Sequence, residues 1–369
     1  MRGANSKQEA MFSCVSPEAR VLARHPLRPI RAMSSAALAQ MDGRFEKLHS
    51  QTGRHSIAPE RLIWALLPQV LYSTRSERLL IEQLDYKFLF GRFVGRSAGA
   101  PVWDHSPFRK NRDRLLEADI AREHFEAIVE QTRLAGLLSD EHFGVDGTMI
   151  KARASHKWLR PKDGSGGSGG SGGRDQARDL RGDQRTNDTL ASTTDPEAKP
   201  YRKNVGTSAK LAYLGHAVSE NRHGLIVAVQ VTQASGTVER SAAIDMLGEL
   251  SGPRSCTLAA DEGYHTHEFV RQTRELNVTP RVAQNVERRG GSANNARTTR
   301  RAGYAVSIKA RKFLEESLGW AMDIGILGRP TMRSRRKIEV RHAPDLHRLQ
   351  PGTHAQSSRT GIYVVLAPS

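Results

Sequence analysis

Two short apolar segments, far apart in the chain, each run directly into an aspartate. Residues 142–145 lead into Asp146 and Gly147, and residues 256–260 lead into Asp261. An apolar run of this length between turn signals predicts a buried strand that ends where the turn begins. A carboxylate in that position is held at the rim of a sheet. Two such rims side by side would bring two acids to one place.

An acid pair of this kind, joined by a third acid, predicts a divalent metal site. Mg²⁺ (or Mn²⁺) binds through carboxylate oxygens, and Mg²⁺ usually takes one or two carboxylates plus substrate phosphates. The arrangement suits two-metal phosphoryl transfer. Taken singly, an aspartate followed by glycine at a strand end is ordinary turn chemistry. The functional interpretation therefore requires both aspartates, a third acid and the charge of the chain.

That charge is strongly positive. The 369 residues include 56 Lys and Arg against 39 Asp and Glu, which gives a net charge of +17. Such a surplus predicts a polyanionic partner, namely nucleic acid. A basic solvated surface without a fixed partner is the alternative.

Cysteine usage and hydropathy exclude several classes of protein. Cys14 and Cys256 are the only cysteines, which excludes a zinc cluster and a disulfide framework. Cys256 lies in an apolar run and is predicted to be part of the core. No signal peptide is visible, and no run approaches the ~18 apolar residues that a membrane span needs. We therefore expect an intracellular, soluble protein with no membrane partner.

The chain is predicted to divide into three parts. Residues 1–140 read as helices, with a capping box over residues 74–77, and residues 141–320 carry strands and helices. Within the second part, residues 151–208 include a Gly/Ser run at 164–173 and predict a flexible insertion. Residues 321–369 form a basic, proline-interrupted tail that we expect to be poorly ordered.

The order of elements in the second part predicts the fold class. Strands are predicted at residues 142–145, 210–216, 225–231, 256–260 and 280–284, with helices at 239–250, 267–276 and 310–320. The order of three strands, helix, strand, helix, strand and helix is that of the ribonuclease H-like fold, whose first and fourth strands are neighbours. The prediction is thus an α/β protein: a helical N-terminal DNA-binding domain followed by a ribonuclease H-like mixed-sheet catalytic domain.

The last predicted helix offers a third acid, because Glu315 and Glu316 are adjacent there. A glutamate on a helix packed against the sheet would complete the metal site, although adjacent glutamates usually form a solvated face. His216 lies at the end of a predicted strand, a position that is typical of a histidine with a structural hydrogen bond. The alternative is that His216 lies near the metals.

The chain resembles bacterial insertion-sequence transposases of the DDE type, in the group of the fifth insertion sequence. The resemblance runs from Met1 to about Trp320 and is carried by several short segments. These are residues 26–31, 72–78, 83–86, 102–106, 145–148, 192–196 and 297–300.

The resemblance implies that Asp146 and Asp261 are the catalytic, metal-binding aspartates. The family's glutamate follows an arginine after three intervening residues and precedes a lysine after six. Arg311 and Glu315 match the first part, so Glu315 is favoured over Glu316, but Met322 occupies the lysine position. Two Mg²⁺ ions held by the three acids would cut DNA at the element's ends and join those ends to target DNA.

The resemblance implies that the partner is double-stranded DNA, both the terminal inverted repeats of the element and the target DNA. It also implies that the protein acts as a homo-oligomer on DNA. The expected location is the bacterial cytoplasm, in association with the nucleoid. Basic residues are predicted to contact phosphates without reading sequence, and the helical domain to recognise the element's ends. The candidates are Arg75, Arg78, Arg109, Lys110, Arg112, Arg288, Arg289, Arg297, Arg300, Arg301 and Arg311.

Beyond Trp320 the sequence departs from the family, because relatives continue with an apolar helical end. The basic, proline-interrupted composition of this tail indicates a reading-frame change near Trp320. Loss of the helix packing behind Glu315 would reduce activity. Two alternatives therefore stay open beside an active transposase. One is a catalytically impaired DNA-binding remnant, and the other is a nuclease of the same fold that cuts without joining.

Overall fold

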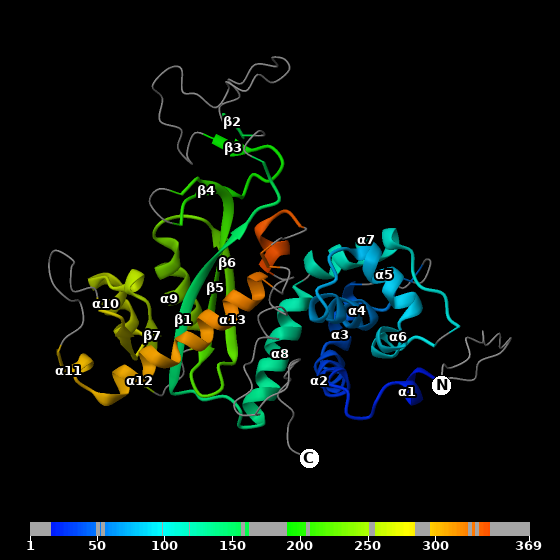
Figure 1. Cartoon of the computed structure of the whole chain (residues 1–369), viewed down its shortest axis with the longest axis horizontal. Coiled ribbons are helices and arrows are strands. Elements are labelled where there is room, and N and C mark those ends of the chain that lie inside the picture. Colours follow the sequence, from blue (N-terminus) through cyan, green and yellow to red (C-terminus); the bar gives the residue numbers. More distant parts are fainter. Residues whose placement is uncertain are drawn as a thin grey trace, which may run out of the picture.

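The structure is a computed structural model that describes residues 16–48, 52, 56–97, 99–117, 119–155, 159–161, 190–203, 207–250, 255–284, 296–323, 327–328 and 332–339. Helices make up the described chain up to residue 134, and a mixed sheet follows (Figure 1). The first eight helices are α1 (Pro17–Arg20), α2 (Leu27–Ala39), α3 (Asp42–Leu48), α4 (Pro59–Leu71), α5 (Glu77–Tyr86), α6 (Phe88–Val94), α7 (His105–Glu117) and α8 (Ile120–Leu134).

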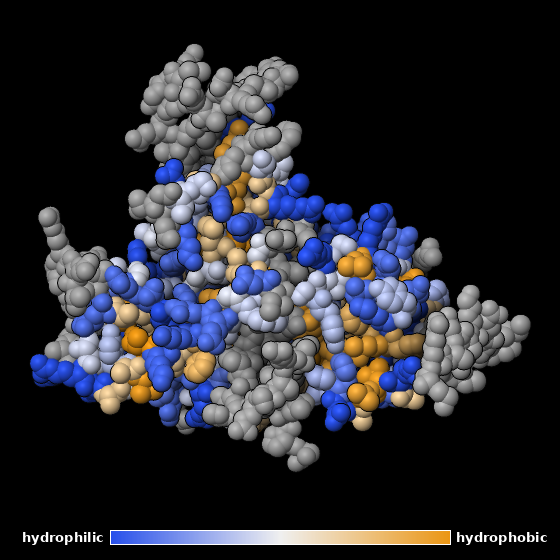
Figure 2. All heavy atoms as spheres, in the orientation of Figure 1, coloured by the Kyte–Doolittle hydropathy of each residue, from blue (hydrophilic) through white to orange (hydrophobic). Residues whose placement is uncertain are grey.

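The helical half has a core of its own. Leu62, Leu80, Phe90 and Phe108 are buried together, each contributed by a different helix from α4 to α7. Packing of one apolar face per helix supplies most of the stability of short helices like these. Apolar residues also reach the surface of this half near α2 and α6 (Figure 2).

The predicted capping box is wrong in detail. The residue that caps α5 is Ser76, whose hydroxyl accepts the Leu79 N–H at 3.1 Å. Thr74 is instead buried, with its hydroxyl 3.3 Å from Gln83 Oε1. A serine immediately before the first helical residue places its oxygen over the free N–H groups of the first turn.

The sheet is built from β1 (His142–Lys151), β4 (Lys199–Tyr201), β5 (Lys210–Glu220), β6 (Ile226–Gln233), β7 (Cys256–Ala260) and β8 (Val278–Val282). The strand order is β4-β5-β1-β7-β8, with β6 also paired to β5. β1 pairs antiparallel with β5 and parallel with β7. The expected contact between the first and fourth predicted strands is confirmed, and Cys256 is buried as predicted.

Helices cover both faces of the sheet. Val145 packs with residues of α9 (Val238–Leu250), whereas Ile150 packs with Leu314 and Leu318 of α13 (Lys312–Asp323). Alternate residues of a strand point to opposite faces, so Asp146 shares the face of Ile150. In Figure 1, α13 crosses this face and α8 lies between the sheet and the other helices. The remaining elements are β2 (Leu159–Pro161), β3 (Leu190–Ser192), α10 (His267–Glu275), α11 (Ala296–Thr299), α12 (Ala302–Ala310) and a 3₁₀ turn at Glu262–Tyr264.

Several predicted boundaries differ from the structure. β1 does not end at Asp146 but continues to Lys151, because β5 pairs with it along that whole length. The fifth predicted strand lies two residues earlier, at Val278–Val282. The last predicted helix, residues 310–320, corresponds to α13, and α12, which precedes it and joins it at Arg311, was not predicted. Pairing and packing partners set these limits, and a single sequence does not display them.

Two segments expected to lack order contribute to the fold. Within the predicted insertion, β4 pairs with β5, and Asp195 is buried and accepts the Tyr213 hydroxyl at 2.6 Å. In the predicted tail, Leu327 and Ile338 are buried in the core cluster that includes Leu314. The prediction of disorder is therefore wrong for these residues. Residues 340–369 and the Gly/Ser run at 164–173 lie outside the described residues.

We expect Tyr213→Phe to lower the free energy of unfolding by about 1 kcal/mol, because it removes the hydroxyl that satisfies buried Asp195. Asp195 Oδ1 keeps the Ser334 N–H at 3.4 Å, which limits the loss. Chemical denaturation measures the effect. Tyr86→Phe, at an exposed tyrosine, is the matched control and should leave stability unchanged.

None of the helices in the described part of the chain combines the length and apolar character required to cross a membrane.

Candidate active site

Strand pairing brings the two predicted aspartates together. In the parallel ladder between β1 and β7, Gly144 pairs with Ala259. Two residues further along both strands, the same register places Asp146 beside Asp261. β7 ends at Ala260, so Asp261 starts the crossover from the carboxyl end of a strand, where ligands of open α/β sheets usually bind.

Arg311 joins all three predicted acids. Its guanidinium lies 3.8 Å from Asp146 Oδ2, 3.7 Å from Asp261 Oδ1 and 2.7 Å from Glu315 Oε1. Arg311 occupies the junction of α12 and α13, and Glu315 lies one helical turn later on the same face. Residues separated by 115 and 54 positions in the chain are thus assembled around one cation.

Burial differs sharply among the members of this group. The Asp146 and Arg311 side chains are 20% and 12% exposed, whereas those of Asp261 and Glu315 are 52% and 45% exposed. Burial raises the pKa of Asp146 to about 6, opposed by the Gly147 N–H, which donates to Oδ1 at 2.8 Å, and by Arg311. The negative charges of Glu315 and Asp261 raise this pKa further.

The three acids are of the chemical type that binds a divalent cation, but their present spacing does not form a metal site. Among the described residues, no group of three His, Cys, Asp or Glu side chains is close enough to hold a metal ion. The guanidinium lies between the acids and provides the positive charge that a metal would supply. Its Nε and Nη1 are buried without a hydrogen bond, so Arg311 is held by charge more than by geometry. Three carboxylates are the ligands that a hard cation such as Mg²⁺ prefers.

The structure distinguishes the two adjacent glutamates. Glu315 pairs with Arg311, whereas exposed Glu316 pairs with no described residue. The preference for Glu315 rested on a sequence pattern, and the ion pair now gives it a physical basis. Core packing behind Glu315 is present, since Leu314 and Leu318 are buried with Ile338.

The predicted DNA contacts fall into four groups. Arg112 is buried and pairs with Glu77 and Asp113, so its prediction as a DNA contact is wrong. Arg311 is committed to the three acids. Arg288 and Arg289 lie outside the described residues. The other candidates are exposed: Arg75, Arg78, Arg109, Lys110, Arg297, Arg300 and Arg301.

His216 faces the other side of the sheet. It pairs with Gly147 across the β1–β5 ladder, and its Nε2 lies 2.8 Å from the Thr232 hydroxyl. Burial lowers its pKa to about 4, so the ring is neutral at pH 7. Sequence reasoning missed Glu239 and Tyr264, which lie near this side of the acids. Their only sequence signal is position, at the start of a helix and in the turn after Asp261.

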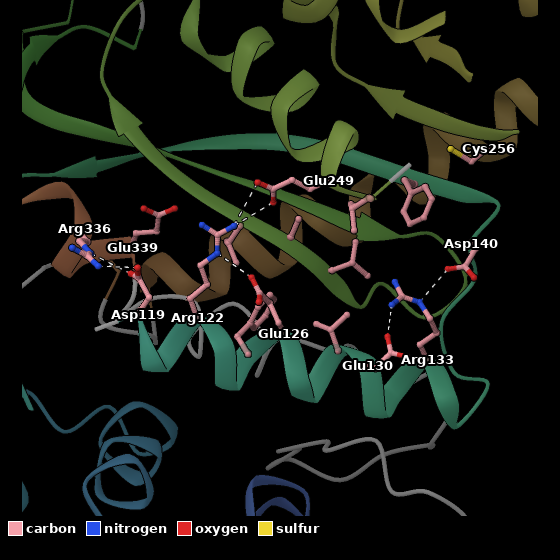
Figure 3. A pocket seen from close by; sticks show the side chains of 17 residues that line it. Asp119, Arg122, Glu126, Glu130, Arg133, Asp140, Glu249, Cys256, Arg336 and Glu339 are labelled. Atoms are coloured by element: carbon pink, nitrogen blue, oxygen red, sulfur yellow. Dashed lines mark hydrogen bonds and ion pairs between the residues drawn. The ribbon is translucent and has the colours of Figure 1, made fainter. Parts of the chain in front are cut away.

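A separate cleft of about 750 Å³ lies between α8 and the sheet. Figure 3 shows that its arginines are occupied by neighbouring acids, for example Arg122 by Glu126 and Glu249, and Arg336 by Asp119. None of the three site acids lines it.

Comparison with known families agrees with this architecture. Residues 15–114 match a family described as Transposase domain (DUF772), and residues 138–342 match the Transposase DDE domain. The second match covers more than half of the chain and extends past Trp320, where a departure was expected. No curated protein matches the chain.

Solved structures offer only distant similarity. The piggyBac transposase synaptic complex with hairpin DNA is 8% identical, with coverage of 85% of this chain and 71% of that chain and a TM-score of 0.36. A Mos1 transposase paired-end complex with the left transposon end is 12% identical over 66% of each chain, with a TM-score of 0.19. A pre-cleavage Mos1 transpososome is 11% identical over 84% of each chain, with a TM-score of 0.20.

The helical region, the mixed sheet that follows it and the two domain matches define a protein of the transposase class. The chain belongs to the DDE transposase family.

Proposed function

We propose that this protein cuts DNA at the ends of a mobile element and joins those ends to target DNA. The single observation that carries the proposal is the convergence of Asp146, Asp261 and Glu315 on Arg311 at the carboxyl end of β7. Three acids gathered at the end of a strand in a chain of net charge +17 suit a reaction on a polyanion that needs divalent cations.

Asp146, Asp261 and Glu315 would hold Mg²⁺ or Mn²⁺, which supplies Lewis acidity toward the scissile phosphate and lowers the pKa of a nucleophilic water or 3′-hydroxyl. Asp146 is the most buried of the acids, and it lies in β1, which pairs with β5 at this position and with β7 up to Gly144. Rigid placement of this kind is what phosphoryl transfer requires from the protein. Arg311 would neutralise the acids until cations arrive.

Exposed basic residues would hold the DNA backbone. Arg297, Arg300 and Arg301 lie just before α12, the helix that leads to Arg311, and so directly precede the segment that carries Arg311 and Glu315. Arg75, Arg78, Arg109 and Lys110 are exposed on the helical half, residues 1–140, to which we assign recognition of the element's ends. Two ends must be processed together, so we also propose a homo-oligomer on DNA.

The function is tested with duplex DNA that carries the inverted repeats flanking the gene, either intact or already nicked at the element's end. Mg²⁺-dependent cleavage of the intact duplex and joining of the nicked one to target plasmid support the proposal. Cleavage without joining would favour a nuclease. DNA binding without either reaction would favour a catalytically impaired remnant.

We expect Glu315→Gln to lower the cleavage rate by about a hundredfold or more, since loss of about 3 kcal/mol of charge stabilisation has that effect. Glu316→Gln is the matched control, because it makes the same change one residue further along the same helix. Rates are measured with saturating Mg²⁺. Equal losses in the two variants would contradict the assignment of Glu315.

A further inference from the structure

A fourth carboxylate lies across the sheet from Asp146, next to the glycine that follows it. Glu239 is in the first turn of α9, and its side chain is half-buried. A Cβ atom added to Gly147 would lie 3.4 Å from Glu239 Oε1, so the carboxylate covers the residue that follows Asp146. It makes no hydrogen bond or ion pair with any residue that the structure describes. Arg240, the next residue of α9, donates to the Gly263 carbonyl at 3.1 Å, so the start of α9 lies against the turn that follows Asp261. Burial raises the pKa of Glu239, Arg240 opposes this shift, and the charge of Asp261 adds to it.

The space over Gly147 is bordered by a second polar group without a partner. His216 Nδ1 would lie 3.3 Å from the same added Cβ atom, and His216 is completely buried. Its Nε2 is occupied by Thr232, whereas Nδ1 has no hydrogen-bond partner. Glu239 and His216 therefore both border the space over Gly147, which a side chain at position 147 would fill.

Tyr264 lies in the 3₁₀ turn that directly follows Asp261. It is 2% exposed, and its hydroxyl also lacks a hydrogen-bond partner. Burial raises its pKa well above the usual value, and the charges of Glu239, Asp146 and Asp261 raise it further. The hydroxyl is thus exposed to the negative charges of Glu239, Asp146 and Asp261. A buried polar atom left without a partner destabilises the fold, so two of them near an unpaired carboxylate indicate a site for a hydrated ion.

The charge balance of the site points the same way. Two divalent cations bring four positive charges, and Arg311 adds another, against three negative charges from Asp146, Asp261 and Glu315. A fourth carboxylate reduces this imbalance. The alternative role of Glu239 is structural, since an acid in the first turn of a helix complements the helix dipole.

We propose that Glu239 is a fourth carboxylate of the active site and binds a divalent cation together with Asp261. The Tyr264 hydroxyl and His216 Nδ1 would bind the water that hydrates this cation. The inference rests on the proposed function, because it deepens the same site, and it concerns binding rather than chemistry.

The test is a Mn²⁺ titration of the full chain without DNA, with free Mn²⁺ followed by electron paramagnetic resonance. We expect the parent to bind two Mn²⁺ ions and Glu239→Gln to bind one of them at least about tenfold more weakly. Glu249→Gln is the matched control, because it removes an exposed carboxylate from the same helix. It should bind Mn²⁺ like the parent.

The outcomes separate this inference from the proposed function. If Glu239→Gln and the parent bind Mn²⁺ equally, Glu239 has only the structural role and the inference is overturned, while the three-acid site stands. If the parent binds no Mn²⁺, the proposed function fails as well. If Glu239→Gln does not fold, Glu239→Asp is titrated instead. Its shorter side chain should weaken one Mn²⁺ site severalfold, and parental affinity would overturn the inference.

Discussion

Asp146→Asn should lower Mg²⁺-dependent DNA cleavage by about a thousandfold or more, because the cation then loses its most rigidly held ligand. A loss of about 4 kcal/mol of transition-state stabilisation corresponds to that factor. The same variant should be at least as stable as the parent at neutral pH without metal. Loss of activity with retained stability is the signature of a functional carboxylate rather than a structural one.

The expected stability follows from the raised pKa of Asp146, which is about 6 in the folded protein against the ordinary 3.8 of an aspartate. The folded chain binds this proton more tightly than the unfolded chain, so the ionised carboxylate destabilises the fold above about pH 6. That cost disappears as the pH falls through 6 toward 3.8. The advantage of Asp146→Asn should therefore be at most about 3 kcal/mol at pH 7 and vanish near pH 4.

Urea denaturation in EDTA between pH 4 and 7 measures this difference, and cleavage is assayed on the same preparations. Asp140→Asn is the control, because it changes an aspartate near the start of β1 that lies outside the acid group. Parental cleavage by Asp146→Asn would remove the claim that Asp146 takes part in catalysis.

Arg311→Ala should lower the free energy of unfolding by about 2 kcal/mol in EDTA, and saturating Mg²⁺ should restore most of the loss. Without the guanidinium, Asp146, Asp261 and Glu315 repel one another around a partly buried space. Removal of one partner from a buried ion pair costs roughly 3–5 kcal/mol, and the exposure of Asp261 and Glu315 reduces that figure here. A bound cation stabilises the folded state by mass action, about 2.7 kcal/mol at a hundred times its Kd.

Thermal unfolding in EDTA and in Mg²⁺ gives the comparison. Lys312→Ala removes an exposed cation from the adjacent position and serves as the control. If Arg311→Ala is as stable as the parent in EDTA, and Mg²⁺ stabilises both equally, then Arg311 does not substitute for the cation.

Local sequence patterns were sufficient for the order of β1, β5, β6, β7 and β8 and of the helices α9, α10 and α13, but not for β4 or α12. The apolar runs before Asp146 and Asp261 are β1 and β7, and the turn at residues 221–224 joins β5 to β6. Such runs have few alternatives to burial, so their positions could be predicted. The ends of these strands could not be predicted. Asp146 lies inside β1 because β5 pairs with β1 as far as Lys151, and residues 142–151 alone do not indicate how long β5 is.

The same limit applies to the segments expected to be disordered. Polar composition predicted a flexible insertion at residues 151–208, yet Asp195 is buried against Tyr213, which lies in β5. A polar residue can enter a core when one specific partner satisfies it, and composition averages do not record such pairs. Ile338 is likewise buried in the core cluster that includes Leu314 and Leu318 of α13.

The sequence by itself determined which acids are available, which strands precede them, and that the chain carries an excess of positive charge. These are properties of single residues and of short periodic runs, which act over a few positions. Only the tertiary structure decided that Arg311 lies among the three acids, that Arg112 is buried, and that Glu239 and Tyr264 lie nearby. Those facts depend on how helices pack across a sheet, and packing joins residues that have no relation along the chain.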